Sequence, residues 1–339
     1  MSKRLTIALA GNPNSGKTTV FNSLTGSRQH VGNYPGVTVE KKEGNLNYKG
    51  YEITVIDLPG TYSLTAYSID EIVTRNFVVE EKPDVVIDVI DASNLERNLY
   101  LATQFMELEV PLVLAFNMFD LAEKQGLAVD KERLSELLGC PIVFTVATKK
   151  TGITELLEEA IKLKEGPVIL KKVKVDYGRE MEEEIKKIGD ILTEDRVLTQ
   201  KYVSRWLAIK LLEGDSEVIK KAKASLHAGR VLEQTEKSIN HLKNIFGDNP
   251  ETVIAEWRYG LISGACSEAA QRTYELRHTT SDKIDKVLVN RILGLPIFLG
   301  LAWLLFKFIF VFSEPLMRWI EIGQAWLQQL ARSLLPKGA

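Results

Sequence analysis

The stretch that decides the fold is Gly11-Asn12-Pro13-Asn14-Ser15-Gly16-Lys17-Thr18, which satisfies the pattern GxxxxGK[ST]. It follows the apolar run 5–10 and precedes a helical pattern that opens at Lys17. Its glycines let the backbone wrap around phosphate groups, so that N–H groups and a helix N-terminus face negative charge. Lys17 would then reach the terminal phosphates, and the Thr18 hydroxyl would bind magnesium. An ordinary glycine-rich turn between a strand and a helix is the alternative interpretation.

Around this loop, short apolar runs alternate with helical patterns as far as residue 165. Such alternation predicts an α/β domain with a mostly parallel sheet covered on both faces. The expected strands are Leu5–Ala10, Ile53–Asp57, Val85–Ile90, Leu112–Asn117 and Ile142–Val146. Helices are expected at Leu95–Leu108 and Lys131–Leu138. The stretch Val39–Tyr51, with a Lys49-Gly50 turn, predicts an added antiparallel hairpin.

Between 166 and 277, the β signals vanish after the stretch VILKKVKVDY at 168–177, and the helical patterns that follow predict an all-α domain. The expected helical stretches are 180–192, 199–215, 216–246 and 252–276. The apolar stripe of Trp206, Ile209 and Leu212 is interpreted as core rather than as a groove for a partner.

Residues 292–312 read ILGLPIFLGLAWLLFKFIFVF, with Lys307 as the single charge. About 20 such residues cover the roughly 30 Å thickness of the hydrocarbon layer, so the segment predicts a transmembrane helix. A buried core helix is the alternative. Basic residues are more frequent before the segment than after it, which places the N-terminal part in the cytoplasm. The tail 313–339 has apolar residues at helical spacing and would lie on a membrane surface or pack on further helices.

The composition excludes several classes of protein. The chain has 339 residues, with 43 basic and 45 acidic residues and a formal net charge of -2. This balance argues against a strongly basic nucleic-acid binder, and 45% hydrophobic residues argue against global disorder. Cys140 and Cys266 are too few for a disulfide framework or a multi-thiolate zinc site, so a reducing compartment is expected. The four histidines have no ligand spacing.

Two carboxylate motifs follow at the ends of expected strands. In Asp57-Leu58-Pro59-Gly60, Asp57 would hold magnesium through water and the Gly60 N–H would sense the terminal phosphate; an ordinary turn is the alternative. Asn117-Met118-Phe119-Asp120 would read guanine, because the Asp120 carboxylate can accept hydrogen bonds from N1 and the 2-amino group that adenine lacks. Alone, Asp120 could equally be a helix N-cap. Asp84, Asp88 and Asp91 resemble a metal cluster, but capping and structural roles are favoured.

With these motifs in order, the chain resembles a translation-factor-class GTPase and, within that class, the ferrous iron transport protein B (FeoB) family. The resemblance is carried by the segments GNPNSGKTTVFNSLTG, VGNYPGVTVEKKEG, DLPGTYSL, DASNLERNLYLATQ, RYGLISG and SDKIDKVLVNRILGLPIFL. It implies a GTPase domain at 1–165, a helical domain similar to a nucleotide-dissociation inhibitor at 166–277, and a juxtamembrane linker at 278–291. The transmembrane helix at 292–312 and the tail at 313–339 would begin the permease.

The resemblance also assigns residues. Those that would bind GTP are Asn14, Ser15, Gly16, Lys17, Thr18, Thr19, Gly36, Thr38, Asp57, Gly60, Asn117, Met118, Asp120, Val146, Ala147 and Thr148. Magnesium would be held by Thr18, Thr38 and Asp57. Potassium, as an activator, would be held by Asn14 and switch I carbonyls such as those of Gly32 and Tyr34. The residues expected to promote hydrolysis are Asn14, Lys17, Thr38 and Gly60.

The sequence departs from the general pattern at two positions. Thr61 stands where many GTPases carry the glutamine that orients water, so slow hydrolysis is expected. Met118 replaces the lysine common in the base-reading motif. A single membrane span cannot form an ion path, so the chain is interpreted as a fragment or as one half of a split transporter.

The resemblance implies a regulatory GTPase of a ferrous iron transporter in a bacterial or archaeal inner membrane. Expected partners are GTP or GDP, the lipid bilayer and the missing permease helices, with small accessory Feo proteins and a second copy of the chain as further candidates. Nucleic acid is not expected. Two alternatives remain: a membrane-tethered guanine-nucleotide sensor that acts by binding, and a GTPase that acts on RNA or ribosomes.

Overall fold

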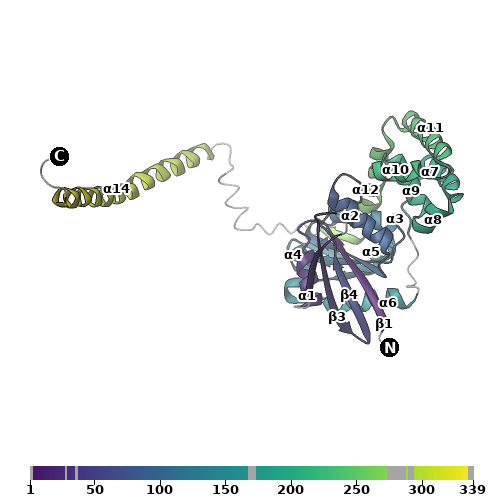
Figure 1. Cartoon of the computed structure of the whole chain (residues 1–339), viewed down its shortest axis with the longest axis horizontal. Helices are drawn as coiled ribbons and strands as arrows, with labels where there is room; N and C mark the ends of the chain where they lie inside the picture. The colour runs from purple at the N-terminus through teal and green to yellow at the C-terminus, as the bar shows by residue number, and fades with distance from the viewer. Residues whose placement is uncertain are drawn as a thin grey trace. The chain divides into compact units, whose positions relative to one another are not determined.

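The computed structural model describes residues 3–26, 29–34, 37–166, 173–272, 288 and 294–334, with side chains left out at 272, 312–316 and 331–334. Two compact units divide the chain, Met1–Tyr274 and Glu275–Ala339 (Figure 1). The predicted GTP ligand Gly36 lies outside the described residues, as does the predicted linker 278–291 apart from Leu288.

The first unit is built around a seven-stranded sheet in the order β2-β3-β4-β1-β5-β6-β8. Strands β4, β1, β5, β6 and β8 are parallel, and β2 and β3 add an antiparallel edge. The predicted parallel sheet is therefore confirmed. The strands are β1 (Lys3–Gly11), β2 (Gln29–Asn33), β3 (Glu40–Tyr48), β4 (Tyr51–Asp57), β5 (Val85–Asp91), β6 (Leu112–Asn117) and β8 (Ile142–Phe144).

Helices cover both faces of this sheet, and the alternation of side chains along β1 shows why. Ile7 and Leu9 point into a core with α1 (Lys17–Thr25) and α6 (Ile153–Glu165). Ala8 and Ala10 point into the core on the other face. That second core contains residues of α2 (Ile69–Asn76), the π-helical turn η1 (Phe77–Glu81), α3 (Leu95–Glu107), α4 (Phe119–Lys124) and α5 (Lys131–Leu138). Short 3-10 turns occur at η2 (Ala92–Asn94) and η3 (Ala147–Lys149).

The predicted hairpin is antiparallel, but it forms between β3 and β4 rather than within Val39–Tyr51. Its turn is Lys49-Gly50, as predicted, with φ values of 48° and 81°. Both residues are therefore left-handed, which a two-residue turn of this kind requires. Strand β2 was not predicted, because its sequence is short and polar and all five of its residues are exposed.

The region from 173 to 272 is helical, with one correction. Its helices are α7 (Gly178–Thr193), α8 (Arg196–Lys201), α9 (Ser204–Leu212), α10 (Ser216–Lys223), α11 (Ala228–Phe246) and α12 (Pro250–Ala269). The expectation of no further strand was wrong: β9 (Ala270–Arg272) ends the predicted helix 252–276 and pairs with β7 (Leu127–Val129). Strands of three residues are too short to show the alternation of apolar and polar residues by which a strand is recognised in a sequence. The stripe of Trp206, Ile209 and Leu212 is buried, as predicted.

The two predicted helices 199–215 and 216–246 are each broken. Tyr202 is extended and ends α8 before α9 begins, and residues 224–227 separate α10 from α11. The carboxylates of Asp195 and Asp215 accept backbone N–H groups in the first turns of α8 and α10. These N-caps mark helix starts inside segments whose apolar pattern looked continuous.

A buried charge cluster joins the sheet domain to the helices that follow it. Arg258 of α12 donates to both carboxylate oxygens of Glu107 on α3, at 2.7 and 2.8 Å, and it also contacts Glu213. The Tyr177 hydroxyl donates to Glu107, and Lys210 pairs with Glu213 at 2.7 Å. The side chains of these charged residues are at most 3% exposed. Removing one member would leave a buried charge unpaired, so the cluster fixes how the helices dock.

The second unit contains a long helix, α14 (Gly294–Leu334), which has 41 residues. Its first part, Gly294–Val311, has a mean hydropathy of 2.1, and none of it is buried within the described protein. By its length and apolar composition this part of the helix fits the predicted membrane anchor. The helix continues past residue 313, so the described part of the predicted tail belongs to the same helix.

The three aspartates considered as a metal cluster have separate roles. Asp91 accepts the Ser93 N–H, and Asp84 accepts the Thr6 N–H. Asp88 is buried in β5, and neither carboxylate oxygen has a hydrogen-bond partner among the described residues. Among the residues that the structure describes, no group of three or more His, Cys, Asp or Glu side chains could hold a metal ion. The predicted capping role is confirmed for Asp91, which caps the 3-10 turn η2, and Asp84 has a structural contact with β1.

Burial raises the pKa of Asp88 from 3.8 to about 8. Because the folded-state pKa lies above the unfolded one, the folded protein loses stability as the pH rises from about 4 to 8. We expect Asp88→Asn to stabilise the full chain relative to the native protein by at least about 1 kcal/mol more at pH 8 than at pH 4.5. Thermal unfolding in detergent at the two pH values measures this difference.

Asp190→Asn, which changes an exposed aspartate on α7, is the matched control. It should leave the pH dependence of the unfolding temperature unchanged. The same pH dependence in Asp88→Asn and the native chain would contradict an uncompensated carboxylate in the core.

Candidate functional site

The phosphate-loop motif connects the end of β1 to the start of α1. Asn14 and Gly16 have φ values of 69° and 84°, so left-handed residues alternate with others in this loop. The Ser15 N–H donates to the Asn12 carbonyl at 3.2 Å, and the Thr19 N–H donates to the Gly16 carbonyl at 3.0 Å. This curvature turns backbone N–H groups toward one concave region at a helix N-terminus, an arrangement that suits anions. Asn14 and Thr18 are exposed there.

A second turn of the chain lies against this loop: Asp57–Gly60, at the end of β4. The Lys17 ammonium pairs with Oδ1 of Asp57, and their side chains are only 11% and 7% exposed. The Thr61 N–H donates to the Gly11 carbonyl at 3.2 Å. A Cβ atom at Gly60 would lie 3.4 Å from the Pro13 Cα. The structure therefore brings together Lys17, Asp57 and Gly60, as the spacing of the motifs predicted.

The segment predicted as switch I is folded onto the sheet edge. Gly32 lies in β2 opposite Lys41 of β3. The Tyr34 hydroxyl is buried and donates to the Asp57 carbonyl at 3.2 Å, while the Tyr34 carbonyl accepts the Val37 N–H at 3.3 Å. Thr38 is exposed. Tyr34 thus reaches Asp57 through its phenol, a contact that the sequence did not indicate.

Beside the phosphate loop is a cavity of about 250 Å³. It is lined by Gly16, Thr19, Asn117, Met118, Asp120, Leu121, Val146, Ala147 and Thr148. All of these except Leu121 were predicted to bind GTP. Leu121 escaped prediction because nothing in the sequence distinguishes it from other apolar residues of α4. The cavity brings the predicted base-reading residues of three separate segments to one place.

Asn117 holds the walls of this cavity together. Its Nδ2 donates to the Ser15 carbonyl at 2.9 Å, and its Oδ1 accepts the Ala147 N–H at 3.1 Å and the Thr145 hydroxyl at 3.3 Å. The side chain is buried. Asn117 therefore positions the phosphate loop and the loop after β8, a bridging role that its motif alone does not reveal.

Asp120 lies at the rim of the cavity, where Lys149 pairs with its Oδ2 at 2.6 Å. The hydrogen bond from Lys149 holds the pKa of the Asp120 carboxyl below its ordinary value. Asp120 is thus kept ionised, as a hydrogen-bond acceptor for two N–H groups must be. Lys149 was not predicted, although it directly follows the loop Val146-Ala147-Thr148.

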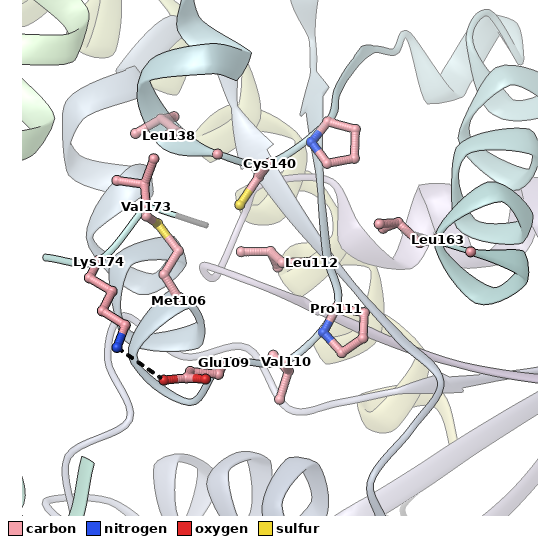
Figure 2. Close-up of a pocket in the computed structure, with 13 residues that line it drawn as sticks. Met106, Glu109, Val110, Pro111, Leu112, Leu138, Cys140, Leu163, Val173 and Lys174 are labelled. Atoms are coloured by element: carbon pink, nitrogen blue, oxygen red, sulfur yellow. Dashed lines mark ion pairs between the residues drawn. The ribbon is translucent and has the colours of Figure 1, made fainter. Parts of the chain in front are cut away.

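A second cavity, of about 290 Å³, lies near the opposite ends of the strands and contains none of the predicted site residues (Figure 2). Apolar side chains such as Met106 and Leu112 line it together with Cys140, and Lys174 lies 4.0 Å from Glu109 at one side. Burial raises the pKa of the Cys140 thiol to about 12, so this cysteine is not an activated nucleophile. The candidate site is therefore the region around the phosphate loop.

The phosphate loop, the Asp57–Gly60 turn and the cavity beside Asp120 all lie at the carboxyl ends of parallel strands, where open α/β sheets bind ligands. Together they define the class of the first domain, which is a P-loop GTPase fold.

Comparison with known proteins specifies the family. The family description "Ferrous iron transport protein B" matches residues 5–160, and "FeoB cytosolic helical domain" matches residues 177–271. The Fe(2+) transporter FeoB of Escherichia coli K12 is 39% identical over 332 residues, which is 96% of this chain and 41% of that protein. A Fe(2+) transport protein A/FeoB fusion protein of Porphyromonas gingivalis is 38% identical over 337 residues, 98% of this chain and 40% of the fusion.

Solved structures agree with the sequence matches. The cytosolic domain of the T. maritima FeoB iron transporter in a GDP form is 37% identical, with a TM-score of 0.69 over 79% of this chain and 100% of that one. A mutant of S. thermophilus NFeoB bound to mGDP is also 37% identical, with a TM-score of 0.71 and the same coverage. The chain belongs to the ferrous iron transport protein B family, and it spans about two fifths of the length of the curated relatives it matches.

The approach of Gly16 to Asn117 generates a prediction. A Cβ atom at Gly16 would overlap Nδ2 of Asn117, and the φ of 84° disfavours any side chain. We expect Gly16→Ala to weaken the binding of fluorescent GDP by the full chain at least about tenfold, because the phosphate loop must shift.

Gly189→Ala is the control, since a Cβ atom at this position on α7 would meet no atom of the described part of the chain within 4 Å. It should bind GDP as the native chain does. Native affinity in Gly16→Ala would mean that this loop does not hold the nucleotide.

Proposed function

We propose that this chain is the GTP-binding and GTP-hydrolysing regulatory part of a ferrous iron membrane transporter. The observation that carries the proposal is the meeting of the phosphate loop, the Asp57–Gly60 turn and the cavity at Asp120 in one region. Solved relatives described as GDP and GMPPNP forms add support. Ferrous iron is the transported substrate of the whole protein and would pass through permease helices.

The proposed binding follows from the chemistry of the site. The phosphate-loop N–H groups and Lys17 hold the phosphates, and the Gly60 N–H contacts the terminal one. Asp120 and the loop after β8 recognise guanine. The N–H of Ala147, which donates to Asn117 Oδ1 in the structure, would turn to the guanine O6, while Asn117 keeps its contact with the Thr145 hydroxyl. Asn117 keeps the phosphate loop and the loop after β8 at a fixed distance from one another. Each charged hydrogen bond to the base contributes about 1.5–3 kcal/mol, enough to prefer guanine over adenine.

Two cations fit the oxygen donors of the site. Thr18 is exposed beside the Lys17–Asp57 pair, and its hydroxyl, that of Thr38 and the Asp57 carboxylate are the hard ligands that magnesium prefers. Asn14 is exposed in the phosphate loop and would hold potassium with the Gly32 and Tyr34 carbonyls. Bound there, both cations would neutralise charge that develops on the phosphates.

Water attacks the terminal phosphate directly, without a covalent intermediate, and hydrolysis is slow. Thr61 is only 3% exposed, and its hydroxyl donates to the Ser63 carbonyl at 2.5 Å, so it is not available to orient water. Loss of the terminal phosphate frees Thr38 and Gly60, and both switches relax. The helical domain then transmits the change toward the membrane part.

The same Thr61 contact favours a second candidate function, a membrane-tethered sensor that acts by binding guanine nucleotide.

In either case we propose a GTPase domain at 1–165, a helical domain at 166–277 and a membrane helix from 292, with the first two in the cytoplasm of a bacterial or archaeal cell. Permease helices and an accessory Feo protein are the proposed partners; the relative fused to transport protein A supports the latter. A homo-oligomer is a further candidate assembly.

Steady-state GTP hydrolysis by the full chain in potassium and in sodium at equal ionic strength tests the proposal. We expect potassium to raise the rate at least about tenfold, because a positive charge beside the phosphates stabilises the charge that develops there, and we expect Asn14→Ala to abolish this gain. Gln29→Ala, an exposed change on β2, is the control that should keep it. A measurable rate that neither cation nor Asn14→Ala changes would contradict the role of Asn14 and favour the sensor.

Base recognition has its own test. We expect Asp120→Asn to weaken GDP binding at least about tenfold and to improve binding of xanthosine diphosphate, because an amide can donate to the xanthine 2-oxo group. Glu123→Gln changes an exposed carboxylate on the same helix and should preserve the preference for GDP. If Asp120→Asn still bound GDP in preference to xanthosine diphosphate, the cavity would not be the site that recognises guanine.

A further inference from the structure

A small cavity in the helical domain lies beside the most exposed large apolar side chain of the described residues. The cavity has a volume of about 290 Å³ and lies between α8 and the turn that joins α10 to α11. Leu226 in this turn is 88% exposed, and Val197 on α8 is 68% exposed. Both residues line the cavity, so two apolar side chains are exposed to water at one place.

Hydrogen bonds on either side of Leu226 hold it on the outside of the turn. The Ser225 hydroxyl donates to Oδ2 of Asp195 at 2.5 Å and accepts the His227 N–H at 3.1 Å. Asp195 is 3% exposed, and its other carboxylate oxygen caps α8. Leu226 therefore cannot turn inward without breaking these hydrogen bonds, which is unfavourable. Only a partner from outside the turn can cover it.

Two lysines supply the charge of the cavity. Lys221 donates to the Tyr202 hydroxyl at 2.6 Å and lies 4.5 Å from the centre of the Tyr202 ring, so its ammonium is fixed at the cavity wall. Lys201 also lines the cavity, is exposed, and has no ion-pair partner among the residues that the structure describes. Arg196 and Lys223, each next in sequence to a lining residue, are exposed and add positive charge.

The acidic groups nearby do not neutralise these lysines. Glu194 is occupied by both terminal nitrogens of Arg230, at 2.6 and 3.1 Å. Glu80 lies 3.9 Å from Lys221, but its side chain is 52% exposed and solvent screens the contact. Asp195 uses its oxygens within the turn and the helix cap. The cavity thus combines apolar side chains with an excess of positive charge.

This combination fits an anionic membrane surface. Apolar side chains enter the interfacial layer of a bilayer, while lysines beside them contact the phosphates of anionic lipids, which are enriched in the cytoplasmic leaflet. The chain itself favours a bilayer over a soluble acidic partner. Its helix α14 contains a segment that is long and apolar enough to cross a membrane, so a lipid surface stays close to the domain at a high effective concentration.

We propose that the surface formed by Val197, Lys201, Lys221 and Leu226 docks on the anionic surface of the bilayer in which the chain is anchored. Leu226 and Val197 enter the interfacial layer, and the two ammonium groups contact lipid phosphates. The contact is weak and reversible, because so few groups contribute far less than a membrane-spanning helix. The inference goes beyond nucleotide binding and iron transport, and it rests only on the proposed membrane helix.

A fluorescent label at position 226 tests the inference. The full chain is reconstituted in nanodiscs of phosphatidylcholine alone or mixed with phosphatidylglycerol. Leu226→Cys takes the label selectively, because the native Cys140 and Cys266 are only 6% and 5% exposed. Nitroxides on the lipid headgroups quench the label when it lies close to them. We expect quenching to be at least about threefold stronger in the anionic discs, and high salt to remove this difference.

Matched controls exist on α11. Ile245 is 44% exposed near the other end of this helix, so a label on Ile245→Cys should be insensitive to lipid charge. With the label at 226, Lys201→Gln should lower quenching in anionic discs at least about twofold, and Lys243→Gln should not. Both lysines are exposed in the last turn of a helix, so both changes remove the same interaction with a helix C-terminus.

The outcomes separate the docking surface from the membrane helix. If the label at 226 is quenched equally in neutral and anionic discs, or if Lys201→Gln behaves as Lys243→Gln does, docking on lipid is overturned and an acidic protein becomes the occupant to seek. The proposed function then stands. If the chain is recovered with neither kind of disc, the membrane helix and the inference are both overturned.

Discussion

The hydrogen bonds of one buried amide, that of Asn117, hold the candidate site together. They join the loops that follow β1, β6 and β8, three strands whose ends are brought to the same edge of the sheet by parallel pairing. Because the amide approaches the phosphate loop so closely, position 16 has to be glycine. Asn117 thus contacts the phosphate loop and the base cavity at once, and together with the φ of 84° it requires glycine at position 16.

Buried charges perform the corresponding task between the two domains of the first unit. The Glu107–Arg258–Glu213 cluster and the Arg75–Asp215 pair exclude water and connect segments far apart in the sequence. Ion pairs of this kind add little net stability, because desolvation offsets their attraction. They do penalise any alternative docking that leaves a charge alone. The interface between the two domains is therefore specific in its geometry. This specificity makes the interface suited to transmitting a small displacement.

The parts of the fold that the sequence predicted are those with long, periodic signals. Strand β6 and helix α5 agree with their predicted bounds, and the phosphate loop and the base-reading motif were readable because their spacing is fixed by chemistry. Elements without such a signal were missed: β2 is polar, β9 has three residues, and the break at Tyr202 interrupts an apolar pattern. Contacts across the chain were also out of reach. Arg75 and Asp215 are 140 residues apart, and no sequence motif around either residue indicates that the two form an ion pair.

The length of α14 has a geometrical consequence. At 1.5 Å per residue, its 41 residues extend for about 60 Å, roughly twice the thickness of a hydrocarbon layer. A straight helix of this length cannot be immersed in one bilayer along its whole length unless it lies nearly flat. If Gly294–Val311 crosses the membrane, the portion that carries the exposed Trp319, Ile322 and Trp326 extends beyond the hydrocarbon or bends into the interface. Indole rings favour that interface, so the second half of the helix has the composition of a segment that runs along the membrane surface.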